Sequence, residues 1–144
     1  MPSWVNAGFE DYAGRLTREY KLELLEIPLG LRTGADVSPA VQKEGERMLA
    51  AAGDKNYLVA LQVTGKPLST EELAKFLRAR SLEGRAVAFC IGGPEGIAPA
   101  VNERADFRWS LSALTLPHGL ARIVVAEALY RAVSVIKGHP YHRG

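Results

Sequence analysis

Residues 92–96 (GGPEG) directly follow an apolar run, 86–91 (AVAFCI). Glycines at the end of a strand let the backbone approach a ligand closely, although glycines alone more often form a tight turn. Glu95 among them is either a base or ligand-orienting residue, or a solvated turn residue. The pattern is not the G-x-G-x-x-G of dinucleotide sites, and G-x-x-x-x-G-K-[ST] is absent from the whole chain, which excludes kinase and P-loop chemistry.

A second stretch, residues 111–118 (LSALTLPH), alternates small, hydroxyl and apolar side chains just before a long helical segment. Backbone groups and short side chains in such a stretch can line a pocket for a flat, apolar-faced ligand such as an adenine ring. The alternative is a strand end followed by a proline-marked helix start, with His118 merely near the cap. Spacing alone favours that alternative.

The third stretch is the C-terminal tail, residues 139–144 (HPYHRG). A tyrosine, two histidines and an arginine so close together can stack on a base, bind phosphate and exchange protons. The alternative is a frayed terminus. His139 and His142 are three residues apart, but no cysteine or nearby carboxylate completes a coordination set, so we expect no metal.

Nucleophilic catalysis finds little support in the sequence. Cys90 lies within an apolar strand candidate, which is typical of a buried and inert thiol. Ser112 and His118 lack the G-x-S-x-G context of a hydrolase.

The composition indicates a soluble globular protein. The chain has 144 residues, 47% hydrophobic and 24% charged, and we expect one domain over residues 1–144. No apolar run reaches the roughly 18–20 residues that span a bilayer, so we expect no membrane partner. The start lacks the layout of a secretory signal and a single cysteine cannot form an internal disulfide, both of which favour the cytoplasm.

Positive charge is concentrated near the C-terminus. The net charge is +2, but residues 109–144 carry +3 and the preceding residues −1. This asymmetry is typical of an anionic partner at that end, or equally of a solvated basic tail.

Helix-period and strand-like segments alternate along the chain, which predicts an α/β fold with a mainly parallel sheet and helices on both faces. The helices are expected over residues 5–20, 38–53, 69–84, 99–105 and 120–136, the strands over 22–27, 57–63, 86–91 and 107–111, and a loop over 29–37. Ligands of such sheets lie beyond the carboxyl ends of the strands, which directs attention to residues 92–96 and 112–119.

Taken together, the ordered motifs resemble the RlmH family of the SPOUT superfamily, which methylates N3 of a pseudouridine in bacterial large-subunit ribosomal RNA. The resemblance covers nearly the whole chain. The matching segments are KEGE (43–46), GKP (65–67), GGPEG (92–96), LSALTLPH (111–118), EALYRA (127–132) and HPYHR (139–143).

The resemblance implies a trefoil knot over about residues 86–144, S-adenosylmethionine as methyl donor, a homodimer, and 23S ribosomal RNA in the large subunit or assembled ribosome as substrate. A knot is too rare to be inferred from periodicity. The cofactor positions that it implies are Leu61, Gly92, Leu111, Ser112, Ala113, Leu114, Thr115 and Leu116. The tail residues Tyr141, His142 and Arg143 would complete the site near the acceptor base.

One departure from the family concerns the N-terminus. Family members have an additional apolar strand and a glycine turn ahead of the segment matched by residues 1–4 (MPSW). We therefore expect a missing internal strand, unpaired backbone edges and a thinner core, and a native start upstream of Met1 or a shortened form.

Each of the three tail residues is expected to have a separate role in methyl transfer. His142 is the best candidate for the base that removes the imide proton from N3, because histidine titrates near neutral pH. Tyr141 would stack on or hydrogen-bond the base, and Arg143 would bind phosphate or stabilise the deprotonated imide. The sequence is also compatible with two other classes of protein: a SPOUT methyltransferase of transfer RNA, and a non-catalytic dimeric module that binds S-adenosylmethionine or RNA.

Overall fold

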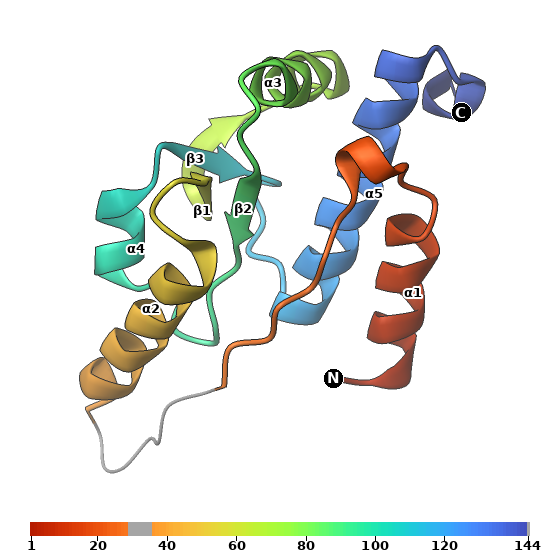
Figure 1. Ribbon diagram of the computed structural model, residues 1–144. Helices are drawn as coiled ribbons and strands as arrows, with labels where there is room; N and C mark the ends of the chain where they lie inside the picture. Colours follow the sequence, from red (N-terminus) through yellow and green to blue (C-terminus); the bar gives the residue numbers. More distant parts are fainter. Residues whose placement is uncertain (29–35, 144) are drawn as a thin grey trace.

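The fold is built around a small parallel sheet, seen in a computed structural model that describes residues 1–28 and 36–143, apart from the side chains of His142 and Arg143 (Figure 1). The strands β1 (Tyr57–Pro67), β2 (Val87–Cys90) and β3 (Phe107–Ser110) lie in the order β2-β1-β3. Both pairings with β1 are parallel, with Val59 opposite Phe89 in β2 and Phe107 in β3. The carboxyl ends of all three strands therefore meet at one edge.

Helices cover both faces of this sheet, as predicted. On one face α3 (Thr70–Leu82) and α5 (His118–Lys137) bury Val59 and Trp109 in the larger core cluster. On the other face α2 (Ser38–Ala52) and α4 (Pro99–Arg104) bury Leu58 and Cys90. Leu58 and Val59 are neighbours on a strand, so their side chains point to opposite faces and each core receives one of them.

A further layer lies outside the α3 and α5 face. Helix α1 (Ser3–Ala13) packs along α5, with its buried side chains Val5 and Phe9 turned inwards. Gly119 and Gly8 lie at this contact, because a side chain at either position would meet Val5 or Ile123. The start of α1 is thereby held against the start of α5, close to the edge where the strands end.

Local sequence signals explain where α3 and α5 begin and end. Ser69 accepts a hydrogen bond from the Glu72 N–H, and the Glu72 carboxylate accepts one from the Ser69 N–H, a complete capping box at the start of α3. Helix α5 ends at Gly138, which has φ +71°, and the His139 N–H then donates to the Ser134 carbonyl. This is the Schellman arrangement, and it turns the tail back along the helix.

Several predicted boundaries differ from the structure. The first helix ends at Ala13 rather than continuing to Tyr20, and a short 3-10 turn, Arg18–Tyr20, follows a break near Gly14. Strand β1 runs on to Pro67 through an irregularity between Leu61 and Lys66. Most of the predicted loop over 29–37 lies outside the described residues.

The strand predicted over residues 22–27 is wrong. The segment is not assigned to any strand of the described chain, although its apolar content is typical of one. A strand exists only where a neighbouring backbone offers a ladder of hydrogen bonds, and here the segment and β2 face a common cavity instead. The outer edge of β2 is accordingly unpaired within the described sheet.

No helix of the described chain combines the length and the apolar character needed to cross a membrane.

Candidate functional site

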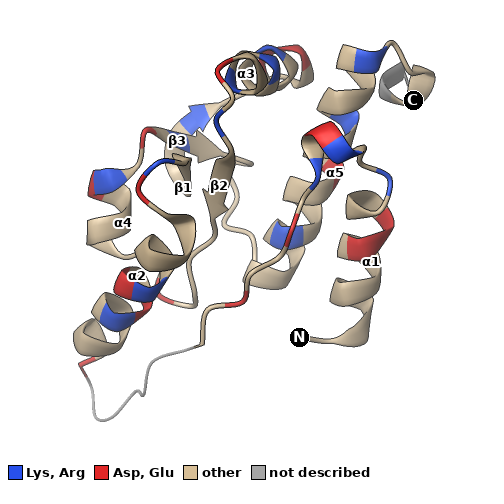
Figure 2. Ribbon diagram, viewed as in Figure 1, with Lys and Arg blue, Asp and Glu red and all other residues tan. Residues whose placement is uncertain are grey.

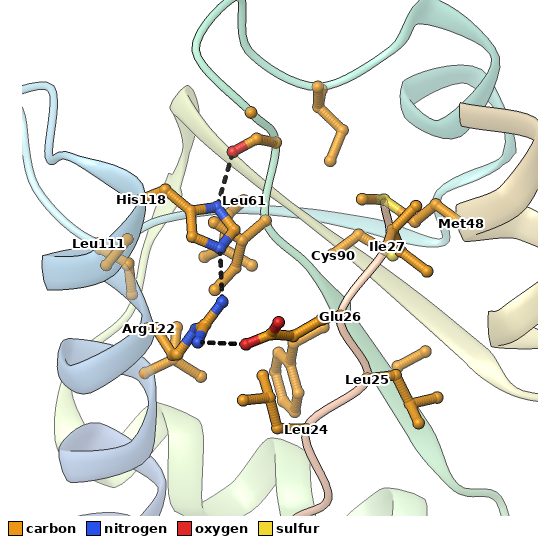
Figure 3. Close-up of a pocket in the computed structure, with 18 of the residues that line it drawn as sticks. Leu24, Leu25, Glu26, Ile27, Met48, Leu61, Cys90, Leu111, His118 and Arg122 are labelled. Carbon is orange, nitrogen blue, oxygen red and sulfur yellow. Dashed lines mark hydrogen bonds and ion pairs between the residues drawn. The ribbon is translucent and has the colours of Figure 1, made fainter. Parts of the chain in front are cut away.

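A cavity of about 1220 Å³ opens at the edge where the strands end (Figure 3). Its walls come from residues 21–27, the inner side of α2, the middle of β1, β2 with the glycine loop after it, the segment after β3, and the first two turns of α5, with Met1 and Phe9 at one side. Of the eight positions implied as cofactor-binding, the cavity is lined by Leu61, Gly92, Leu111, Ser112, Leu114, Thr115 and Leu116. Ala113 is exposed and is not part of the lining. Leu61, Gly92 and Leu111 are thus brought together, although Leu61 and Leu111 are 50 residues apart in sequence.

Gly92 cannot be replaced without moving the backbone. A Cβ at this position would overlap the Gly96 carbonyl group and the Ile97 nitrogen. The loop closes on itself at this point, because the Gly96 N–H donates to the Gly93 carbonyl over 3.0 Å. Gly92, Gly93 and Gly96 also line the cavity, and glycines allow a ligand to approach the backbone closely.

The segment after β3 is shaped by its own serine hydroxyls. Ser110 Oγ donates to the Ser112 carbonyl over 3.0 Å, and the Ser112 hydroxyl accepts from the Leu114 N–H over 3.0 Å. These bonds form a local turn of the kind that serine side chains favour. The Leu114 side chain is consequently 73% exposed at the rim of the cavity.

A chain of polar contacts joins three walls of the cavity (Figure 3). His118, in the first turn of α5, lies with Nδ1 3.0 Å from the Gly92 carbonyl oxygen and Nε2 3.1 Å from Arg122 Nη2. Arg122 Nη1 in turn donates to Glu26 Oε1 over 3.2 Å. We call Gly92, His118, Arg122 and Glu26 the His118 network. Arg122 is buried, with 4% exposure, whereas the side chain of Glu26 is 62% exposed.

The tail is held against the outer face of α5. Tyr141 OH donates to Glu127 Oε2 over 2.9 Å, and the Tyr141 ring packs edge-on against Tyr130 with Arg131 above it. Arg131 also pairs with Glu127 at 2.7 Å. Burial, followed by the hydrogen bond to Glu127, raises the pKa of Tyr141 to about 12. Its phenol is therefore a neutral donor at physiological pH.

Tyr141 does not line the large cavity, and the side chains of His142 and Arg143 are outside the described residues. The partners of Tyr141, Glu127 and Arg131, line a second cavity of about 180 Å³. Leu111 lines both cavities. The tail is thus anchored beside the small cavity, with Leu111 between this region and the large one.

The remaining candidates from the sequence have clear positions. Cys90 is 4% exposed, and burial raises the pKa of its thiol to about 11, so it is a protonated and inert thiol. Glu95 is exposed on the glycine loop. Among the described residues, no three His, Cys, Asp or Glu side chains are grouped to hold a metal ion.

Sequence reasoning missed Arg122 and Glu26. His118 and Arg122 are four residues apart, a spacing that places both on one face of a helix, and this signal was available. The contact of Arg122 with Glu26 joins residues 96 apart in sequence and leaves no local signal.

Comparison with known proteins shows which proteins the chain is similar to. A family model described as "Predicted SPOUT methyltransferase" matches residues 1–142. The chain is also 55% identical over 144 residues to "Ribosomal RNA large subunit methyltransferase H" of Pseudomonas fluorescens, a match that covers 99% of this chain and 93% of that protein.

The burial of Cys90 predicts slow alkylation. With a pKa of about 11, the thiol is only about one part in a thousand thiolate at pH 8, and the thiolate is the reactive form. We expect iodoacetamide to modify the native protein at least about 100-fold more slowly than the protein unfolded in urea at the same pH. Mass spectrometry of timed samples gives both rates, and equal rates would contradict a buried thiol.

The contact of Tyr141 with Glu127 predicts a loss of stability in alkali. The folded-state pKa of about 12 lies above the unfolded value of about 10, so the contribution of this group is complete below about pH 10 and lost as pH rises towards about 12. At neutral pH, Tyr141→Phe should lower the free energy of unfolding by about 1 kcal/mol. Urea unfolding should show the difference between wild type and variant shrinking over that pH range. Tyr20→Phe, whose ring faces Lys137 rather than a carboxylate, is the control, and a pH-independent difference would refute the assignment.

Proposed function

Because the chain belongs to the SPOUT methyltransferase family, we propose that it transfers a methyl group from S-adenosylmethionine to N3 of a pseudouridine in 23S ribosomal RNA. The observation that carries the proposal is the single cavity that gathers Leu61, the Gly92 loop and residues 111–116 at the ends of parallel strands. A ribosomal RNA substrate is supported by the name of the 55% identical relative. A ribosomal substrate also implies action in the cytoplasm.

The cavity fits a nucleoside with an amino-acid arm. Its lining offers leucine side chains for the faces of an adenine ring, at Leu61, Leu111 and Leu116, and exposed backbone groups in the glycine loop for the ring edge or the ribose. The volume of about 1220 Å³ exceeds the ~300–1,000 Å³ of ordinary ligand pockets. The excess corresponds to the groove between residues 21–27 and the unpaired edge of β2.

When bound, S-adenosylmethionine supplies an electrophilic methyl group on a sulfonium. The protein has to hold acceptor and methyl group in line, and correct positioning of this kind supplies much of the catalysis in such transfers. It also has to remove the imide proton from N3. We assign this step to His142, with Arg143 stabilising the negative charge that develops or binding a phosphate. Tyr141, as a neutral donor bound to Glu127, anchors the tail rather than accepting the proton.

The tail of one copy completes the cavity of a second copy in this proposal. Within one copy, Tyr141 is held at Glu127, nine residues along α5 from His118, or ~14 Å of helix. Exposed apolar side chains on the first turns of α1 and α5 and just before α5, namely Met1, Trp4, Leu114 and Leu120, offer a surface for such a contact. A homodimer places the tail of each copy near the cavity of the other.

The charge distribution favours a structured substrate over free RNA. The net charge is only +2, and basic and acidic residues are intermingled on α2 and α3 rather than gathered on one face (Figure 2). Sequence-independent RNA binding depends on many phosphate contacts. We therefore propose that the large subunit or assembled ribosome is the substrate.

The test is methylation of ribosomes from a strain that lacks this activity, using labelled S-adenosylmethionine and mapping of the modified nucleotide. We expect one labelled pseudouridine in 23S RNA and little label on naked RNA. Label on transfer RNA would replace the proposed substrate, and cofactor binding without transfer to any RNA would indicate a binding module. Gly92→Ala should abolish binding of the cofactor in calorimetry, because the Cβ displaces the loop. Gly84→Ala, strained at φ +70° but outside the lining of the cavity, should cost stability and leave binding intact.

Mixed dimers test which copy supplies the tail. A Gly92→Ala copy retains a normal tail, and a His142→Ala copy retains a normal cavity. If tails act on the partner's cavity, the mixed dimer contains one intact site and should recover about half of the wild-type rate, since one of its two sites is complete. Single-turnover assays of co-purified, differently tagged copies measure this recovery. No recovery, or a monomer in sedimentation analysis, would overturn the arrangement in trans.

A further inference from the structure

We propose that His118 and Arg122 are positioning residues of the cofactor site, which lock the Gly92–Gly93 peptide in the orientation that binds the cofactor. This inference rests on the proposed function, since it assigns the large cavity to S-adenosylmethionine. It is carried by the geometry of the His118 network, in which every donor has a single matching acceptor.

The partners of His118 determine its protonation state. Arginine is a permanent donor with no acceptor, so the contact of 3.1 Å between Arg122 Nη2 and His118 Nε2 requires a lone pair on Nε2. The Gly92 carbonyl can only accept, so the contact of 3.0 Å at Nδ1 requires a proton there. Together the two contacts fix a neutral imidazole that is protonated on Nδ1. A proton on Nε2 would face the N–H of a buried cation.

This protonation state gives the network its effect on the glycine loop. A peptide between two glycines has no side chain to restrict its rotation, so its orientation is free unless something holds it. The His118 N–H holds the Gly92 carbonyl oxygen towards α5. In a trans peptide the carbonyl and the following N–H point in opposite directions. The bond therefore also fixes the direction of the Gly93 N–H, within a loop that lines the cavity.

Arg122, which donates to His118 Nε2, is buried. Its Nε is buried and makes no hydrogen bond with any described residue, which makes the residue costly to bury. Such a cation is weak evidence of a contribution to stability, since an apolar side chain of similar size is often tolerated in its place. Its chemistry accounts for its presence better, because a permanent donor requires Nε2 to stay unprotonated and an apolar residue does not. Glu26 completes the chain from the exposed side.

The same geometry separates His118 from the catalytic histidine. Both of its ring nitrogens are engaged, one by Gly92 and the other by Arg122. It therefore has no free lone pair with which to take a proton from the acceptor base. Its role is to act on the cofactor through the loop, which leaves the proton transfer to the tail.

Three variants separate this role from general support of the fold. His118→Phe keeps a ring but removes both hydrogen bonds. His118→Asn keeps an amide donor at the place of Nδ1 and so retains the bond to Gly92. Arg122→Met keeps the volume and removes the donor to Nε2. The matched control is Lys137→Gln, which removes another charge of α5 from an ion pair with a glutamate, Glu19, at the far end of the helix.

The readouts are the Kd of S-adenosylmethionine by calorimetry and the KM for cofactor and for ribosomes. We expect His118→Phe to raise Kd and cofactor KM about tenfold, the equivalent of about one hydrogen bond. His118→Asn should stay within about threefold of wild type, and Arg122→Met should lie between the two. The KM for ribosomes and all values for Lys137→Gln should be unchanged. Loss of folded protein lowers the maximal rate but not the affinity of the fraction that binds, so a change in KM identifies positioning.

A spectroscopic measurement tests the network without the cofactor. ¹⁵N NMR distinguishes protonated from unprotonated ring nitrogens, and His118 of the wild type should be protonated on Nδ1 alone at neutral pH. In Arg122→Met, a population of His118 protonated on Nε2 should also appear. An imidazolium or an Nε2–H ring in the wild type would overturn the proposal, as would wild-type affinity in a folded His118→Phe. Absence of cofactor binding by the wild type would instead refute the proposed function, and the inference with it, whatever the NMR spectrum shows.

Discussion

The parallel pairing of β1 with β2 on one side and β3 on the other is the constraint on which the site depends. Parallel strands end at one edge of their sheet, and β1 lies between the other two. The chain leaving β2 at Gly92 and the chain leaving β3 at Leu111 therefore emerge two strand spacings apart, ~10 Å. Leu61, just beyond the part of β1 that pairs with β2, lines the same cavity. The width of that opening suits a flat ligand.

The sequence predicted this architecture where local and tertiary signals agreed. The apolar run before Gly92, the capping box at Ser69 and the proline-marked start of α2 all correspond to elements of the fold. Prediction failed where a segment needed a distant partner. Residues 22–27 carry a strand pattern, but a strand is defined by its neighbour, and this segment faces a cavity rather than a ladder.

The positions around the cavity were predicted from family motifs, but the contacts that these residues make are visible only in the folded structure. Gly92 appeared in the sequence as a flexible residue, whereas in the structure it is a site of contact, where a single Cβ would overlap Gly96. The sequence predicted that Tyr141 stacks on or hydrogen-bonds the acceptor base; the structure adds that its hydroxyl donates to Glu127 and that its ring packs against Tyr130. Neither contact leaves a pattern in the sequence, because both join residues brought together by a helix end or a loop.

Helix α5 explains how one element serves both the cofactor and the tail. Its first turn carries His118 and contacts the glycine loop, and its last turn ends at Gly138 in a conformation that sends the tail back along its outer face. Over 20 residues the helix spans ~30 Å and is buried along much of its length, so it is stiff enough to transmit position between its ends. Tyr141 is held at Glu127, nine residues or ~14 Å along α5 from His118, and does not line the large cavity of its own copy. In the proposed homodimer, a twofold axis would bring the start of one α5 towards the tail of the other copy.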